Sequence, residues 1–266
     1  MFPDTLPAEL VVALAAVRPR LGRLASDLRY FPTIGSTNDV AATAPEGAVV
    51  IAEEQTAGRG RRGHGWFSPP GSGLYVSIVL APSRSIDPRR ATSLTTIAAG
   101  VALADGIEAA VGLRIRLKWP NDLYVGPRKL GGILAEASGR RGSDPGAESV
   151  VVGYGINVGE ASYPPALRDR ATSLESELDR MPPRAHVLAE TLAALSARYD
   201  DLLAGRFDAI LNGWRARANA AGAVVEWNGP DARRSGRVVD IDDDGALLVK
   251  SGGAIERIVS GELTWL

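Results

Sequence analysis

The sequence contains no cysteine and only two histidines in 266 residues. The absence of cysteine excludes disulfides and thiolate chemistry. His64 and His186 are far apart in the chain, and neither has a partner at a metal-ligand spacing. A histidine-rich metal site is therefore excluded as well.

A charge excess of one sign and long apolar runs are also missing. Thirty basic and 31 acidic residues give a net charge of -1, so any basic patch for nucleic acid or membrane has to be local. No run approaches the roughly 18 unbroken apolar residues of a membrane span, and no basic segment followed by an apolar one opens the chain. We expect a cytoplasmic protein without a membrane partner.

The patterning predicts an α+β domain with a mixed sheet, followed by a small β domain. After Gly222, short β-type runs alternate with turn residues, which is typical of a small β-barrel. We place the domain boundary between residues 1–218 and 219–266. Ser36 is expected to cap a short helix through its side-chain oxygen. Helices are expected over 7–17, 87–111, 187–203 and 207–220, and strands over 28–31, 48–53, 74–80, 115–118, 122–125, 129–136 and 150–158.

The run GRGRRGHGW, from Gly58 to Trp66, combines four glycines with three arginines. It matches G-x-G-x-x-G, but it leads into Pro69-Pro70-Gly71, whereas a dinucleotide fingerprint must open a helix. Glycines let backbone N–H groups approach a phosphate, and arginines supply fixed charge with bidentate geometry. The run predicts a loop that covers a polyphosphate. A solvated basic loop and an arginine-glycine patch for RNA are the alternatives.

A lysine and an Asn-Asp pair follow in the next motif region. Lys129 stands just before Gly131-Gly132, and glycines in a strand let a ligand come close to the backbone. Such a lysine can neutralise a carboxylate and a phosphate together, although a lysine at a hairpin turn would look the same. Asn121 and Asp122 are either turn formers or holders of a metal–phosphate group, because Mg²⁺ prefers carboxylate, water and phosphate oxygens.

Two more glycines interrupt a strand in the segment GYGINV. Glycine weakens a strand unless something must approach the backbone there. Gly153 and Gly155 therefore favour a nearby ligand, with a β-bulge as the alternative.

Taken together, these segments resemble the biotin protein ligase family. The resemblance is strong between residues 30 and 160 and continues weakly to Gly261-Glu262. It implies a mixed-sheet catalytic domain of the class II synthetase type, flanked by helices, and a small C-terminal SH3-like β-barrel. The segments that carry it are Ser36-Thr37-Asn38, Gln55, GRGRRGHGW (58–66), KWPNDLY (118–124), RKLGGILAE (128–136) and GYGINV (153–158).

The family's reaction needs no protein nucleophile. The carboxylate of biotin attacks the α-phosphate of ATP, pyrophosphate leaves, and a lysine of a biotin carboxyl carrier domain attacks the mixed anhydride. Catalysis is then mostly positioning and charge stabilisation. The resemblance therefore implies ATP and Mg²⁺ as cofactors, biotin as substrate, a carrier domain as partner, and pairing of two copies through exposed sheet edges.

The resemblance also assigns roles to individual residues. Lys129, with Arg61, would be catalytic, and Asp122 would be a ligand of Mg²⁺. His64 stands where the family loop usually has arginine, which changes the third phosphate contact. The biotin-binding residues would be Ser36, Thr37, Asn38, Gln55, Gly58, Arg59, Gly60, Arg61, Lys129, Gly132, Gly153 and Gly155. The ATP-binding residues would be Arg61, Arg62, Trp66, Asn121, Asp122, Lys129 and Asn157.

Two other functions compete with this one. A lipoate protein ligase shares the fold and the adenylation chemistry, but the full arginine-glycine loop followed by KWPND and KLGGIL favours biotin. A nucleic-acid-binding protein using that loop is the rival of another class, and its binding would weaken steeply with salt. Only 29 residues precede Tyr30, too few for the winged-helix domain of some family members, so we expect no specific DNA binding.

Overall fold

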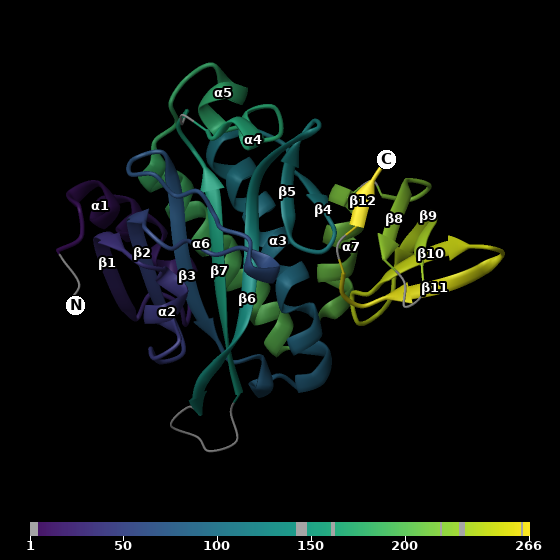
Figure 1. Ribbon diagram of the computed structural model, residues 1–266. Coiled ribbons are helices and arrows are strands. Elements are labelled where there is room, and N and C mark those ends of the chain that lie inside the picture. The colour runs from purple at the N-terminus through teal and green to yellow at the C-terminus, as the bar shows by residue number, and fades with distance from the viewer. Residues whose placement is uncertain (1–4, 142–147, 161–162, 219, 229–231, 262) are drawn as a thin grey trace.

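The computed structural model describes residues 5–141, 148–160, 163–218, 220–228, 232–261 and 263–266. Figure 1 shows its two sheets, with the small one in green and yellow at the right. The strands of the large sheet are β1 (Asp27–Ile34), β2 (Ala48–Gln55), β3 (Gly73–Leu80), β4 (Arg116–Lys118), β5 (Asp122–Val125), β6 (Arg128–Arg141) and β7 (Glu148–Asn157). Those of the small sheet are β8 (Val224–Asn228), β9 (Arg233–Ile241), β10 (Leu247–Ser251), β11 (Ala254–Ile258) and β12 (Leu263–Trp265).

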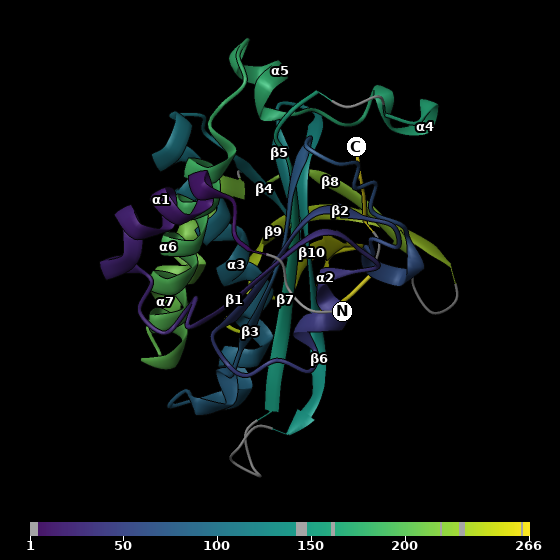
Figure 2. The same ribbon diagram turned by 90° about the vertical axis from the view of Figure 1, so that its left-hand side faces the viewer.

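The helices cover the large sheet unequally. Figure 2 shows α1, α3, α6 and α7 on one side of the sheet and α2 on the other. The helices are α1 (Ala8–Val17), α2 (Thr37–Ala41), α3 (Pro88–Val111), α4 (Pro165–Arg168), α5 (Leu174–Leu178), α6 (Arg184–Leu203) and α7 (Phe207–Ala218), with short 3₁₀ turns at Arg18–Arg20, Arg61–Gly63 and Pro82–Arg84. The face that carries α2 is therefore the less covered by helices.

The large sheet is mixed, as the sequence predicts. Its order is β1-β2-β3-β7-β6-β5-β4; β1 and β2 are parallel, and the other neighbours are antiparallel. Because side chains alternate along a strand, β7 serves both faces. Val152, Tyr154 and Ile156 join the main core on the helix side, so Gly153 and Gly155 fall on the α2 side.

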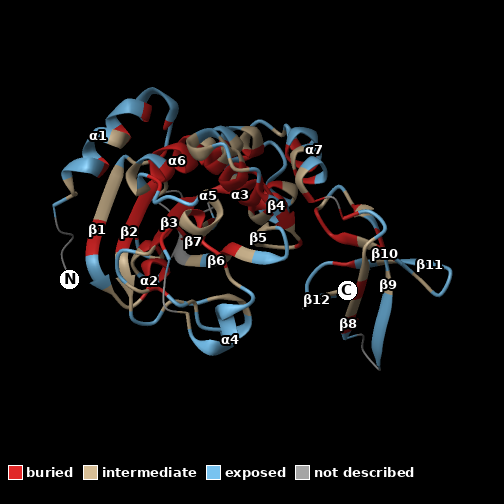
Figure 3. Cartoon of the chain, turned by 90° about the horizontal axis from the view of Figure 1, so that it is seen from above, coloured by how far each residue is buried: buried red, intermediate tan, exposed pale blue. Residues whose placement is uncertain are grey.

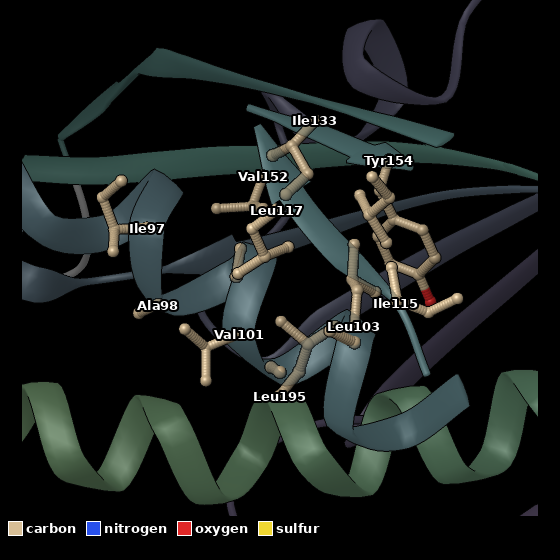
Figure 4. Close-up of a cluster of buried hydrophobic side chains, with 14 of the residues drawn as sticks. Ile97, Ala98, Val101, Leu103, Ile115, Leu117, Ile133, Val152, Tyr154 and Leu195 are labelled. Carbon is tan, nitrogen blue, oxygen red and sulfur yellow. The ribbon is translucent and has the colours of Figure 1, made fainter. Parts of the chain in front are cut away.

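The core lies between the large sheet and helices α3 and α6. Figure 3 shows buried residues concentrated in these elements. In Figure 4, Ile97 and Val101 of α3 gather with Ile133 and Val152 of the strands and with Leu195 of α6. Helix α3 is capped by Asp87, which accepts a hydrogen bond from the Arg90 backbone N–H.

The sequence predicts no membrane span, yet helix α3 has the length and composition of one. By length and composition it is apolar enough to cross a membrane, but 67% of its most apolar window is buried in the protein. Threonine, serine and glycine interrupt its apolar residues, so it contains no long unbroken apolar run. Its apolar side chains pack against the large sheet and α6.

Most elements expected from the sequence form, and the differences are local. Ser36 does stand at the N-cap of α2, but its side chain makes no capping hydrogen bond, so that prediction was wrong. Helices α4 and α5 and strand β12 were not predicted. The C-terminal strands form a β domain of order β11-β10-β9-β8-β12; within the described residues, no pairing of β11 with β12 closes it into the expected barrel.

One glycine allows α3 and α6 to pack closely. A Cβ atom at Gly106 would lie 2.5 Å from Thr191 Cα and 2.8 Å from the Glu190 carbonyl oxygen. Both are backbone atoms, which cannot move aside. At Gly100, in the same helix, a Cβ would meet only side-chain methyl groups at 3.6 Å or more.

We therefore expect Gly106→Ala to lower the free energy of unfolding by about 1–3 kcal/mol, because the two helices must separate. Gly100→Ala is the matched control and should be neutral or stabilising by up to about 1 kcal/mol, because alanine favours helix. Urea denaturation of both variants measures the difference. Equal effects at the two positions would contradict this account of the helix contact.

Candidate active site

A cleft of about 470 Å³ opens on the α2 side of the large sheet. Its walls come from α2, the arginine-glycine loop (residues 58–66), β5 to β7, the segment 163–171 and the small domain near Gly261 and Leu263. Of the residues predicted for the site, those that line it are Ser36, Thr37, Asn38, Gln55, Arg59, Gly60, Arg61, Arg62, Trp66, Asn121, Asp122, Lys129, Gly132, Gly153, Gly155 and Asn157. A second hollow of about 420 Å³ lies on the small domain and is shallow and open.

Gly58 is the predicted site residue that does not line the cleft. A Cβ there would lie 2.6 Å from the Trp66 carbonyl oxygen and 2.7 Å from Ser68 Oγ. Its backbone carbonyl accepts a hydrogen bond from the Trp66 N–H. Gly58 therefore closes the base of the loop, because only glycine fits where the two ends of the loop meet.

The strand glycines make room for other side chains of the protein. A Cβ at Gly153 would lie 2.1 Å from Asn38 Oδ1, and one at Gly155 would lie 2.2 Å from Trp66 Nε1. Gly132, which pairs with Gly155 across β6 and β7, is 3.4 Å from the Trp66 ring by the same measure. The sheet face is thus bare at these positions, and Asn38 and Trp66 lie directly on it.

A network of neutral polar groups forms one end of the cleft. The Thr37 backbone N–H and hydroxyl both donate to Gln55 Oε1, at 2.9 and 3.0 Å, and Gln55 Nε2 donates to Ser68 Oγ. Ser77 Oγ lies 2.7 Å from Thr37 Oγ1 and 2.6 Å from Asn38 Oδ1. Thr37, Asn38 and Ser77 are buried, so their orientations are fixed before any ligand arrives.

The three arginines of the loop have different surroundings. Arg59 makes ion pairs with Asp39 and with Glu136. Arg61 is partly buried and donates to Asn121 Oδ1 at 3.3 Å. Burial lowers the pKa of Arg61, and the neighbouring charge of Arg62 lowers it further. Arg62 is exposed and has a left-handed φ of 56°.

Lys129 is held by both its side chain and its backbone. Its Nζ lies 2.6 Å from Asp122 Oδ1 and 5.5 Å from the centre of the Trp66 ring. The contact with Asp122 is an ion pair and not an aligned hydrogen bond, since Asp122 Oδ1 is buried without a hydrogen-bond partner. The Lys129 backbone pairs with Arg170 and Thr172. The lysine therefore stands at the floor of the cleft in a defined place.

Positive charge dominates this end of the cleft. In the described part of the chain, six arginines and lysines line the whole cleft against one carboxylate, that of Asp122; one of the six, Arg59, is paired with Asp39 and Glu136. Burial lowers the pKa of Lys118, and the charges of Lys129 and Arg170 lower it further, while Asp122 opposes them. Crowded cations that have lost part of their hydration are relieved by an anion. The cleft is therefore suited to a negatively charged ligand.

The donors for a metal ion are few. Within the described ranges, no group of three or more His, Asp or Glu side chains could hold a metal. Asp122 offers one carboxylate. The side-chain amide of Asn121 already accepts a hydrogen bond from Arg61 and donates one to the Ile133 carbonyl. Mg²⁺ commonly needs only one or two carboxylates when substrate phosphates supply the other oxygens. The single carboxylate of Asp122 fits a metal ion that takes its other ligands from phosphate oxygens and water.

Several cleft residues were missing from the predicted site. Lys118 and Tyr124 belong to the motif KWPNDLY, so the sequence did contain a signal for them. Ser77 does not line the cleft but contacts Thr37 and Asn38, which do; its signal was a polar residue inside the apolar run LYVSIVL. Arg170 had none, because only the backbone pairing of its segment with Lys129 brings it to the cleft. Asn157 donates to the Thr172 carbonyl and so fixes this same segment. Glu262 lies outside the described residues.

Known proteins resemble this chain over most of its length. The family model described as the biotin/lipoate A/B protein ligase family matches residues 30–157, and the one for the biotin protein ligase C-terminal domain matches 228–263. The bifunctional ligase/repressor BirA of Bacillus spizizenii is 35% identical over 89% of this chain and 73% of its own. The biotin–(acetyl-CoA-carboxylase) ligase of Paracoccus denitrificans is 34% identical over 81% and 89%.

Solved structures agree with these sequence matches. The biotin protein ligase of Aquifex aeolicus, in complex with biotin and ATP, superposes with a TM-score of 0.78 and 27% identity over 91% of this chain and 99% of that one. This overlap extends across both domains seen here. With both family models in the expected order and relatives above 30% identity, the chain belongs to the biotin protein ligase family.

Proposed function

We propose that this protein is a biotin–(acetyl-CoA-carboxylase) ligase, which activates biotin as biotinyl-5'-AMP with ATP and transfers biotin to a lysine of a biotin carboxyl carrier domain. One observation carries the proposal: a single cleft joins a neutral, pre-oriented polar end to a strongly cationic end. Biotin has a neutral ureido ring at one end and a carboxylate at the other. The order of groups in the cleft matches the order of groups in the substrate.

The neutral end is suited to the ureido ring. Ser36 lines the cleft, and its hydroxyl is not used to cap α2. Thr37 and Gln55 are held by their mutual hydrogen bonds. A buried polar site of this kind favours a ligand with matching donors and acceptors, since any other ligand leaves the site's groups unpaired. Ser36, Thr37, Asn38 and Gln55 would therefore select biotin.

The cationic end is suited to the carboxylate and the phosphates. Lys129 would hold the biotin carboxylate next to the α-phosphate and stabilise the charge that develops between them. Arg61 and Arg62 would cover the phosphates. Trp66, whose Nε1 is buried and unpartnered, would lie against the nucleotide. Asn157 would keep the neighbouring wall in place through Thr172.

Further assignments concern the metal ion, the domain boundary, the dimer and the location in the cell. Mg²⁺ would be bound by Asp122 together with phosphate oxygens, and Asn121 would orient Arg61 on the same side. The domains would divide at 218/219, between α7 and the first strand of the small sheet. A homodimer would use an edge of the large sheet, which is bordered by β1 and β4. A cytoplasmic location would give access to ATP and to the carboxylase acceptor.

The decisive experiment is ATP–pyrophosphate exchange with each of two acids. We expect biotin to drive exchange and lipoate to drive little or none, because the neutral end is built for a ureido ring. Exchange with lipoate alone would establish the lipoate ligase alternative. No exchange with either acid, in protein that is folded by circular dichroism, would contradict the adenylation reaction itself.

Lys129→Ala should cripple adenylation, because two anions would then face each other without a cation during attack. We expect exchange to fall about a hundredfold or more, corresponding to about 3 kcal/mol of transition-state stabilisation. Lys250→Ala, an exposed lysine of the small domain, is the control and should behave like wild type. Urea denaturation checks that both variants fold. Near-normal turnover in Lys129→Ala would remove this residue from the chemical step.

Arg61→Gly should still form biotinyl-5'-AMP but release it prematurely. The change removes the bond to Asn121 and adds freedom to a loop that already has four glycines. The leak would be measured as biotin on lysines of an unrelated bystander protein. Arg62→Gly is a useful comparison and should leak less, because φ is already positive at Arg62 and no bond to Asn121 is lost. Complete loss of adenylate in Arg61→Gly would place Arg61 in the chemical step instead.

A further inference from the structure

Arg59 is attached on both sides, unlike the other two arginines of its loop. Its Nη1 lies 2.7 Å from Asp39 Oδ1 in α2, and its Nη2 lies 3.1 Å from Glu136 Oε2 in β6. The hydrogen bond to Asp39 raises the pKa of Arg59, and Glu136 raises it further, although burial opposes both. The Arg59 guanidinium is therefore already neutralised and is poorly suited to bind a phosphate.

Glu136 has a second contact that connects it to the neutral end of the cleft. Its Oε2 accepts a hydrogen bond of 2.6 Å from Asn38 Nδ2. Asn38 is 5% exposed, and its Oδ1 is bound by Ser77. One carboxylate oxygen therefore joins a buried amide of the ligand pocket to an arginine of the loop.

The alternation of β6 explains why Glu136 can reach both partners. Gly132 pairs with Gly155 and Glu136 pairs with Val151, and Val151 belongs to the small core cluster under α2. Glu136 thus points to the same face as the cleft glycines. It lies beside Asn38, which fits onto Gly153, and just below the base of the loop.

We propose that Glu136 is a positioning residue for biotin: together with Asp39 it clamps Arg59, and this holds the first half of the loop in its biotin-binding shape before a nucleotide binds. The clamp divides the loop in two. Residues 58–60 are tied to α2 and β6 through Arg59. Arg61 and Arg62 make no ion pair in the described part of the chain, and the Arg61 side chain is held only by a hydrogen bond of 3.3 Å to Asn121, so both can still respond to phosphates. The inference rests on the proposed biotin ligase function.

The test compares Glu136→Gln with wild type by calorimetric titration of biotin without ATP, followed by steady-state exchange. We expect the Kd and KM for biotin to rise about three- to tenfold, the range for a partly exposed charged pair with a second hydrogen bond. The KM for ATP and kcat at saturating biotin should change less than about twofold, since the side-chain contacts of Glu136 are with Asn38 and Arg59 and not with Arg61, Arg62 or Lys129. A general loss of structure would instead lower kcat and raise both KM values.

Matched variants separate the clamp from other effects. Glu256→Gln removes a similar pair, Arg234–Glu256 at 3.0 Å, on the small domain and should leave biotin affinity unchanged. Asp39→Asn removes the other half of the clamp from an exposed side chain and should weaken biotin binding in the same direction. Adding Asp39→Asn to Arg59→Met should have little further effect, because the two residues act through one contact.

Each outcome decides a different question. No binding of biotin by wild type would overturn the proposed function, whereas normal binding in wild type, Glu136→Gln and Asp39→Asn alike would overturn the clamp alone. A fall in kcat with unchanged biotin affinity would also overturn it. If Glu136→Gln fails to fold, the same biotin titration of Asp39→Asn and of the double variant Arg59→Met/Asp39→Asn still tests the clamp. Wild-type affinity for biotin in both of these variants would overturn it.

Discussion

The cleft depends on three adjacent positions of the central strands that carry no side chain. Gly132, Gly153 and Gly155 leave the sheet face bare, and the side chains of Asn38 and Trp66 pack onto it. A methyl group at Gly153 would displace the buried amide, and one at Gly155 would displace the indole. Both ends of the cleft would change, because Asn38 belongs to its neutral end and Trp66 lies beside Lys129.

The same strands connect the cleft to the core. On β7, residues that face the helices alternate with those that face the cleft, so the floor of the cleft and the core are built on the same strand. The small domain is attached to the same frame: Trp119 Nε1, in the motif KWPND, donates to the Gly245 carbonyl at 2.9 Å. The small domain therefore helps to hold the wall that carries Lys118 and Asp122.

The cations of the cleft are of two kinds, those paired with a carboxylate and those without an ion pair. Arg59 and Lys129 have carboxylate partners, whereas Arg61 and Lys118 have lost hydration without gaining an ion pair within the described residues, which lowers the pKa of both. Paired cations keep the loop and the strand in place. Cations without an ion pair raise the free energy of the unliganded cleft, and binding of phosphates or a carboxylate lowers it again.

The sequence alone determined the class of fold, most of the elements and the family, because hydrophobic periodicity and contiguous motifs are local properties of the chain. Nearly all of the residues that it predicted for the site line the cleft. It did not assign their partners within the protein: the strand glycines, expected to lie near a ligand, line the cleft and also have Asn38 and Trp66 packed on them. Ser36 was expected to cap a helix that it does not cap. Only the tertiary structure decided that Arg59 is paired with two carboxylates while Arg61 bonds to Asn121, since Asp39 and Glu136 lie 20 and 77 residues from Arg59 along the chain. Contacts over such separations are set by sheet register and packing, which no local pattern encodes.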